Sequence, residues 1–122
     1  MGGLQIESTQ PGEGILSQAN GTLSVEQATL ILGQNLVAMS VLGKITTGGK
    51  YKEFDPAAVD GSETAAAILY GEIDATAADK EITIIERLVE LRENSLAWKT
   101  GLTSDQKAAA LVTLAAKFII AR

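Results

Sequence analysis

The sequence of 122 residues contains no cysteine and no histidine. These absences exclude disulfide bonds, zinc sites built from thiolates or imidazoles, cysteine nucleophiles and Ser-His-Asp triads. Prolines number only two, and aromatic residues make up 4% of the chain. Because 46% of the residues are nevertheless hydrophobic, the core must consist of Ile, Leu, Val and Ala. A chain of this length is expected to form one domain with one small core.

Positive charge is absent from the first 43 residues, which carry only Glu7, Glu13 and Glu26. All ten Lys and Arg residues lie from Lys44 onward, and the net charge is −5. An acidic chain repels phosphate backbones, so we expect no direct binding of nucleic acid. Two interpretations of the asymmetry stay open, namely chance combined with solubility and a separate role for the N-terminal part.

Long hydrophobic runs are also missing. The stretch 28–43 is uncharged, but Gly33-Gln34-Asn35 interrupts it, and a membrane-spanning helix needs roughly 20 mostly apolar residues. We therefore expect two strands joined by a turn, and no membrane partner. The N-terminus lacks the basic start and apolar stretch of a signal peptide, and the absence of cysteine fits assembly in the cytosol.

Residues 1–22 are rich in Gly, Gln, Ser, Thr and Asn, which disfavours regular structure. We interpret them as a flexible N-terminal arm, followed by a domain over 23–122. Apolar residues at intervals along the arm suggest that it becomes ordered against a partner. The candidate contacts are Leu4, Gln5, Ile6, Ile15 and Leu16.

Short apolar segments separated by turn residues predict a mainly β domain. Gly48-Gly49 supplies the positive φ angles of a two-residue hairpin turn, and Asp55-Pro56 and Asp60-Gly61-Ser62 mark further turns. Segment 81–93 fits either a strand or one helical face, and we favour strands. The strands are predicted at 28–32, 36–42, 45–47, 50–52, 66–73, 96–98 and 118–121.

One helix is predicted over 104–117. Thr103 can cap it, and Gln106 three residues later completes a capping-box pattern. An apolar stripe is expected to face the core, and it consists of Ala108, Leu111, Val112, Ala115 and Phe118. The predicted fold class is therefore mainly β with one C-terminal helix.

No catalytic, cofactor or metal site is predicted. Segment 43–51 resembles a phosphate-binding loop, but no Ser or Thr follows its lysine and no helix opens there. The four aspartates of the turn-rich region do not have the spacing of a calcium loop, and each is explained by turn hydrogen bonds; they are Asp55, Asp60, Asp74 and Asp79. Trp98, the single tryptophan, is either an interface anchor or an ordinary core or rim residue.

The order of several motifs resembles the lambda-type bacteriophage head decoration proteins. No single motif is specific, but their joint order from about Leu23 to Arg122 is. They are Val41-Leu42-Gly43-Lys44-Ile45-Thr46, Gly49-Lys50-Tyr51-Lys52, Asp55-Pro56-Ala57-Ala58, Asp60-Gly61-Ser62, Ala67-Ile68-Leu69, 74–80, Arg87 with Glu90, Lys107-Ala108-Ala109, Leu114-Ala115-Ala116 and Ile119-Ile120. The family commonly has glycine where this chain has Met39, and methionine resists positive φ, so the turn there is expected to be disturbed.

The resemblance implies a β-clip-like decoration-protein fold with an extended N-terminal arm, assembled as a homotrimer. It implies that the trimer binds the outer surface of the expanded phage head at three-fold and quasi-three-fold positions. There it would stabilise the capsid against the pressure of packaged DNA, with the arm contacting the major capsid protein. The protein would be made in the cytoplasm of a bacterial host and end in the virion, with no enzymatic activity and no cofactor.

Two other classes of function stay open at this stage. One is a β-clip-type domain that binds a small ligand or accompanies an enzyme, for which a convergent polar cluster would be the sign. The other is a general interaction module carried on a prophage.

Overall fold

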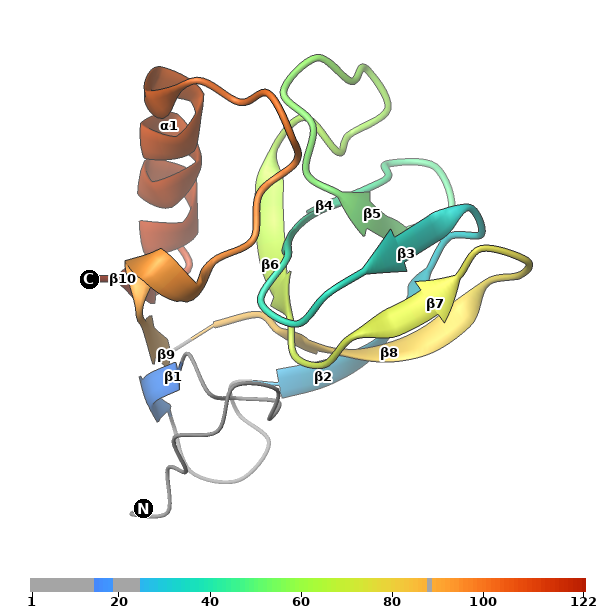
Figure 1. The fold of residues 1–122 in the computed structure, drawn as a ribbon, viewed down its shortest axis with the longest axis horizontal. Helices are drawn as coiled ribbons and strands as arrows, with labels where there is room; N and C mark the ends of the chain where they lie inside the picture. Colours follow the sequence, from blue (N-terminus) through green and yellow to red (C-terminus); the bar gives the residue numbers. More distant parts are fainter. Residues whose placement is uncertain (1–14, 19–24, 88) are drawn as a thin grey trace.

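The computed structural model describes residues 15–18, 25–87 and 89–122. Figure 1 shows a β-barrel with one helix standing beside it. The elements are β1 (Ile15–Gln18), β2 (Val25–Leu30), β3 (Gln34–Leu36), β4 (Val41–Lys44), β5 (Tyr51–Glu53), β6 (Ala65–Leu69), β7 (Ile73–Ala75), β8 (Lys80–Ile85), β9 (Val89–Leu91), the 3-10 helix η1 (Glu93–Ser95), α1 (Ser104–Ala115) and β10 (Ile119–Ala121). The expected fold class, mainly β with one C-terminal helix, is confirmed.

Five strands close the barrel in the order β2-β5-β4-β6-β8. β2 and β8 pair antiparallel over six residue pairs, from Val25 opposite Ile85 to Leu30 opposite Lys80. β2 and β5 meet at one parallel pair only, Leu30 with Tyr51. The barrel is therefore held firmly on one side of β2 and by a single pair on the other. β3 and β7 form a separate two-stranded sheet.

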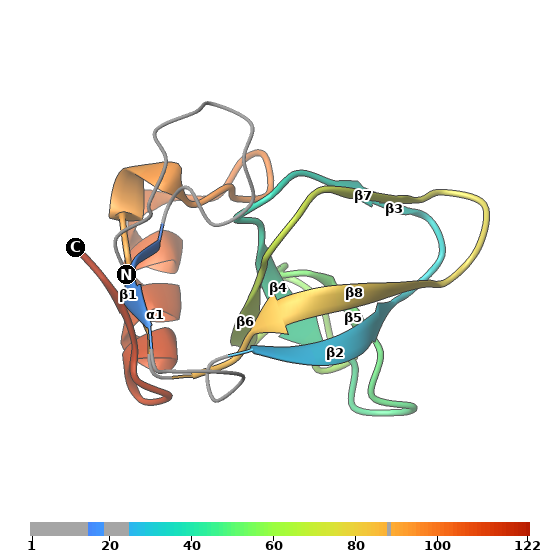
Figure 2. The same cartoon turned by 90° about the horizontal axis from the view of Figure 1, so that it is seen from below.

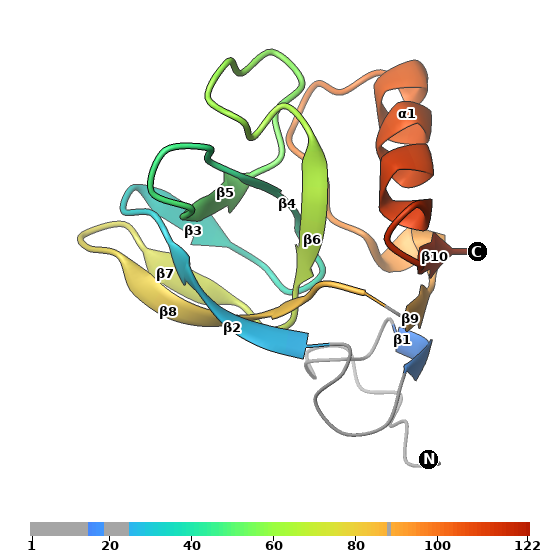
Figure 3. The ribbon, with the colours of Figure 1, turned by 180° about the vertical axis from the view of Figure 1, so that it is seen from behind.

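A second, smaller sheet lies beside the barrel and has the order β1-β9-β10. β1 runs antiparallel to β9, and β10 runs parallel to it. The sheet thus joins the first described strand of the chain to the last, and α1 stands next to it (Figure 3). At the far end of α1 the Lys117 ammonium donates to the Ala66 carbonyl of β6 at 3.1 Å, which ties the helix to the barrel.

The core has two parts, both built from aliphatic side chains as the composition requires. One part fills the barrel and includes Leu30, Leu42, Leu69 and Ile84. The other lies between the barrel, α1 and the three-stranded sheet, and includes Ile68, Leu91, Leu114 and Ile119. Figure 2 shows the fold from below, with the barrel and the helix on opposite sides.

Two predicted strands are each broken into two shorter ones. The predicted strand 36–42 is interrupted where Met39 adopts φ of 69°, and 66–73 is interrupted between β6 and β7. The turn at Met39 is kept, contrary to the expectation. Its N–H donates to Leu69 at 2.8 Å and its carbonyl accepts from Ala97 at 2.9 Å. These two bonds and the burial of the side chain (5% exposed) offset a left-handed conformation that costs about 1–2 kcal/mol.

The hairpin at 45–52 forms with a longer loop than predicted. Gly48 and Gly49 both have positive φ, but the Ile45 N–H bonds the Lys50 carbonyl at 2.8 Å. The loop therefore spans four residues, 46–49, rather than two.

Within 81–93 the strand interpretation is confirmed by β8 and β9. The predicted edge at 96–98 is reduced to one parallel bridge between Ser40 and Ala97.

Candidate protein–protein interface

The outer face of α1 is apolar and exposed. Thr103 and Gln106 form the predicted capping box, with reciprocal bonds of 3.1 and 2.9 Å. The helix buries Ala110 and Leu114, whereas Val112 is 72% exposed. The predicted core-facing stripe is therefore wrong for most of its members. No charged residue occurs from 108 to 116, so the exposed face is formed by Ala108, Ala109, Val112, Ala115 and Ala116.

Phe118 continues this face beyond the end of α1. Its side chain is 64% exposed, and its backbone has φ of 63°, a conformation that is a genuine outlier for a bulky residue. The Phe118 N–H donates to the Ala115 carbonyl at 2.9 Å and so terminates the helix. Glycine would meet the same backbone requirement without strain. An aromatic side chain at such a position, left in solvent, points to a contact outside the chain.

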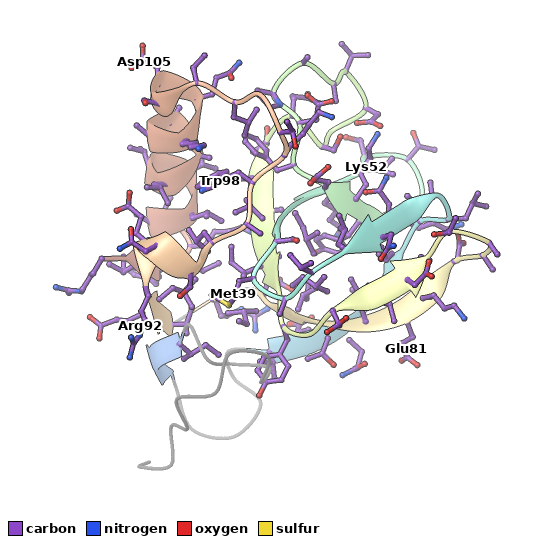
Figure 4. All side chains as sticks on the ribbon, in the orientation of Figure 1. Met39, Lys52, Glu81, Arg92, Trp98 and Asp105 are labelled. Carbon is purple, nitrogen blue, oxygen red and sulfur yellow. The ribbon has the colours of Figure 1, made fainter. Side chains whose placement is uncertain are left out.

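Trp98 lies on the segment between η1 and α1, beside the barrel (Figure 4). Its ring makes an edge-to-face contact with Phe54, with centroids 6.3 Å apart, and it packs against the core next to α1. The side chain is partly buried. These contacts give Trp98 a structural role within the chain, and its role as an interface anchor stays a prediction.

The candidate arm residues are only partly described. Leu4, Gln5 and Ile6 lie outside the described residues, as does the side chain of Leu16. Ile15 begins β1, pairs with Leu91 of β9 and is 8% exposed within the core. The last part of the expected arm is thus a strand of the domain, although Gly-rich sequence surrounds it.

A hollow of about 350 Å³ lies where β2 faces the loop between β4 and β5. Its lining contains the buried Tyr51 and Ile84, together with charged side chains at the rim. Glu26 and Glu86 both pair with Arg87, and Lys50 pairs with Asp79 at 2.5 Å. The lining residues are Glu26, Gln27, Ala28, Thr29, Lys44, Gly48, Gly49, Lys50, Tyr51, Ile84 and Glu86.

Burial and neighbouring charges shift the pKa values of two residues that line the hollow, Tyr51 and Glu26. Burial, followed by the nearby Glu86 and Glu26 carboxylates, raises the pKa of Tyr51. The hydrogen bond from Arg87 lowers the pKa of Glu26. The Lys44 ammonium lies 5.8 Å from the centroid of the Tyr51 ring, and it has no carboxylate within 4 Å among residues 15–18, 25–87 and 89–122.

Three aspartates of the turn-rich region have the local roles predicted for them, whereas Asp79 instead bonds distant residues. Asp55 accepts from Ala57 N–H at 2.9 Å, and Asp74 accepts from Thr76 N–H at 2.9 Å. Asp60 accepts from both the N–H and the hydroxyl of Ser62, and these bonds lower its pKa to about 2. Asp79 bonds the Leu32 N–H at 2.8 Å. Within the described ranges, no group of three or more acidic residues is placed to hold a metal ion.

The loop that resembles a phosphate-binding loop connects two antiparallel strands, β4 and β5. A phosphate loop would open a helix whose N-terminal N–H groups face the anion. The hairpin geometry therefore agrees with the rejection of that motif. In the part of the chain that the structure describes, no helix is long and apolar enough to cross a membrane.

A small barrel and a helix with an exposed, uncharged outer face are features of a domain that presents a contact surface. The sequence model of one protein family, Bacteriophage lambda head decoration protein D, matches residues 4–119. This match covers nearly the whole chain, so the chain belongs to that family. The protein is thus a structural component of the phage capsid. A search of curated proteins found no match.

Sequence reasoning missed two features of this surface. Ala108, Val112, Ala115 and Phe118 were recognised as apolar positions, but they were assigned to the core because an apolar stripe usually faces inward. The hollow beside β2 could not be found, because it depends on which strands fail to pair.

Proposed function

We propose that the protein decorates the outer surface of the expanded phage head as a homotrimer at three-fold and quasi-three-fold positions. There it stabilises the shell against the pressure of packaged DNA by binding the major capsid protein, without catalysis. The observation that carries the proposal is the family match over residues 4–119. The exposed, uncharged face of α1 supports a surface that is covered in an assembly.

The contact between copies is assigned to the outer face of α1. Val112 and Phe118 together expose large apolar side chains, and the surrounding alanines allow a neighbouring backbone to approach closely. Burying this surface contributes roughly 25 cal/mol per Å² of apolar area. Three such contacts in a closed ring would stabilise the trimer without any charged pair.

The contact with the capsid protein is assigned to the N-terminal arm, through Leu4, Gln5, Ile6 and Leu16. Ile15 is buried within the chain, so its role is to anchor the base of the arm through β1. Ordering an arm costs roughly 1–2 kcal/mol per residue fixed, and one arm therefore binds weakly. Three arms on one trimer act together through their effective concentration.

The arm assignment is tested by deleting residues 1–14, which leaves β1 in place. We expect the shortened protein to keep its circular dichroism spectrum and unfolding midpoint but to stop sedimenting with expanded, undecorated heads. Wild-type protein is expected to sediment with the same heads. Full binding by the shortened protein would contradict the role of the arm.

The trimer assignment is tested by Val112→Glu, which places a charge in the centre of the uncharged face. Light scattering is expected to give a trimer for the wild type and a monomer for the variant. Val59→Glu is the matched control, because Val59 is 96% exposed and lies on the loop between β5 and β6. A Val112→Glu variant that stays trimeric would show that this face is not the contact.

A further inference from the structure

The seam between β2 and β5 is weakly paired, although the barrel is closed there. Leu30 with Tyr51 is the one residue pair that joins the two strands, and the Ile31 N–H donates across the seam to the Tyr51 carbonyl at 3.0 Å. Backbone groups alternate in direction along a strand. Odd-numbered residues of β2 therefore direct their N–H and C=O groups away from β8 and toward the seam.

Val25 and Gln27 are the residues left open by this arrangement. Among the described residues, none bonds the backbone groups of Val25 or Gln27 on the seam side. An unpaired strand edge is a template for another strand. The hollow of about 350 Å³ is lined by Gln27 but not by Val25, so it lies beside the Gln27 part of this edge.

The hollow also has the chemistry of a peptide site. Its floor includes Ile84 and the ring of Tyr51, which are buried in the barrel core, so the accessible lining is mainly polar. At the rim, Glu26, Glu86 and Lys50 already form ion pairs. Besides Arg87, Lys44 helps to lower the pKa of Glu26, but it has no carboxylate within 4 Å among residues 15–18, 25–87 and 89–122. An incoming carboxylate would pair with Lys44 without displacing an existing ion pair.

We propose that the edge of β2 at Val25 and Gln27, with Lys44 beside it, receives an extended segment of the capsid protein that carries an acidic side chain. The segment adds a strand to the barrel, with its backbone bonded to Gln27 and its carboxylate paired with Lys44. This inference rests on the proposed function and adds a second capsid contact that is independent of the arm. Charge complementarity at Lys44 selects an acidic segment.

The edge is tested by Gln27→Pro. Proline removes the N–H that faces the seam and places its ring there, and an edge strand tolerates it because no bond to β8 is lost. The Gln27 side chain also donates to the Thr83 hydroxyl at 2.9 Å, so Gln27→Ala is the matched control for that bond. We expect Gln27→Pro to bind undecorated heads roughly tenfold more weakly, and Gln27→Ala to bind as the wild type does.

The ionic contact is tested by Lys44→Met, which keeps the aliphatic stem, against Lys80→Met, which removes the same charge away from the hollow. Binding by Lys44→Met is expected to fall about threefold to tenfold at low salt and to approach that of the wild type near 1 M salt, where surface charges are screened. Lys80→Met is expected to bind normally. Carbodiimide coupling of decorated heads, followed by mass spectrometry, should join Lys44 to an Asp or Glu of the capsid protein.

Three results would overturn the inference. One is full head binding by both Gln27→Pro and Lys44→Met. Another is a carbodiimide link from Lys44 to a second copy of this chain, and the third is loss of the trimer in either variant. The second and third results would each mean that a neighbouring copy of this chain, rather than the capsid protein, occupies the seam. If Gln27→Pro does not fold, the Lys44 variants and the coupling decide. Failure of the wild type to bind heads would instead refute the proposed function.

Discussion

Gly43 is the position where one added methyl group should damage the fold most clearly. A Cβ atom there would lie 2.4 Å from the Ser62 carbonyl oxygen and 2.5 Å from its Cα. Ordinary contacts begin at 3.4 Å, so Ser62 would have to retreat by about 1 Å. Ser62 is fully buried, and its carbonyl accepts from the Asp55 N–H at 3.1 Å, so the loop cannot move freely.

The expected cost of Gly43→Ala follows from these contacts. Overpacking against rigid backbone costs about 1–3 kcal/mol, and weakening the hydrogen bonds of Ser62 adds about 1 kcal/mol. We therefore expect the free energy of unfolding to fall by about 3 kcal/mol and Tm by roughly 10 °C. Denaturant unfolding measures the first and thermal unfolding the second, each followed by the fluorescence of Trp98, which is the single tryptophan and contacts Phe54.

Gly33→Ala is the matched control for Gly43→Ala. Gly33 has φ of +95° but nothing within 4 Å of an added Cβ, so this variant adds backbone strain without a clash. Its expected cost is about 1 kcal/mol. If Gly43→Ala were no less stable than Gly33→Ala, the packing of the 55–62 loop on β4 would not be as described.

Two further predictions concern the turns and the helix. The pKa of Asp60 is lowered to about 2, mainly by the hydrogen bond from the Ser62 hydroxyl, so ionised Asp60 stabilises the fold fully above about pH 4 and loses this effect as the pH falls toward 2. Unfolding midpoints measured between about pH 5 and pH 2 should therefore fall less steeply for Asp60→Asn than for the wild type. Equal slopes would argue against a stabilising role of this carboxylate. Thr103→Ala removes the capping box and should lower the free energy of unfolding, measured with denaturant, by about 1 kcal/mol. Thr113→Ala on the same helix should leave the free energy of unfolding nearly unchanged. Equal decreases for the two variants would mean that the cap is not stabilising.

The features that sequence predicted correctly are those fixed by local chemistry. Thr103 with Gln106 marks the start of α1, and Asp60-Gly61-Ser62 marks a turn, because these residues bond their own neighbours. Features that depend on distant partners were not predicted. The break at Met39 depends on bonds to Leu69 and Ala97, which lie far along the chain.

The candidate interface was harder to predict for a related physical reason. Apolar residues on a helix indicate burial, but they do not say whether the covering surface belongs to the same chain or to another. Ala110 and Leu114 face the core while Val112 faces solvent, and the sequence offers two apolar faces without ranking them. The open edge of β2 is likewise a property of pairing across the barrel.

The sheet β1-β9-β10 has a consequence for the order of folding. Its middle strand pairs with an early strand on one side and with the last strand of the chain on the other. Contacts between distant residues form slowly because long loops must close first. During synthesis β1 has to wait for β9, and the sheet is complete only after residues 119–121 have been made. A chain that stops before residue 119 therefore lacks one edge strand of this sheet and leaves that side of β9 unpaired.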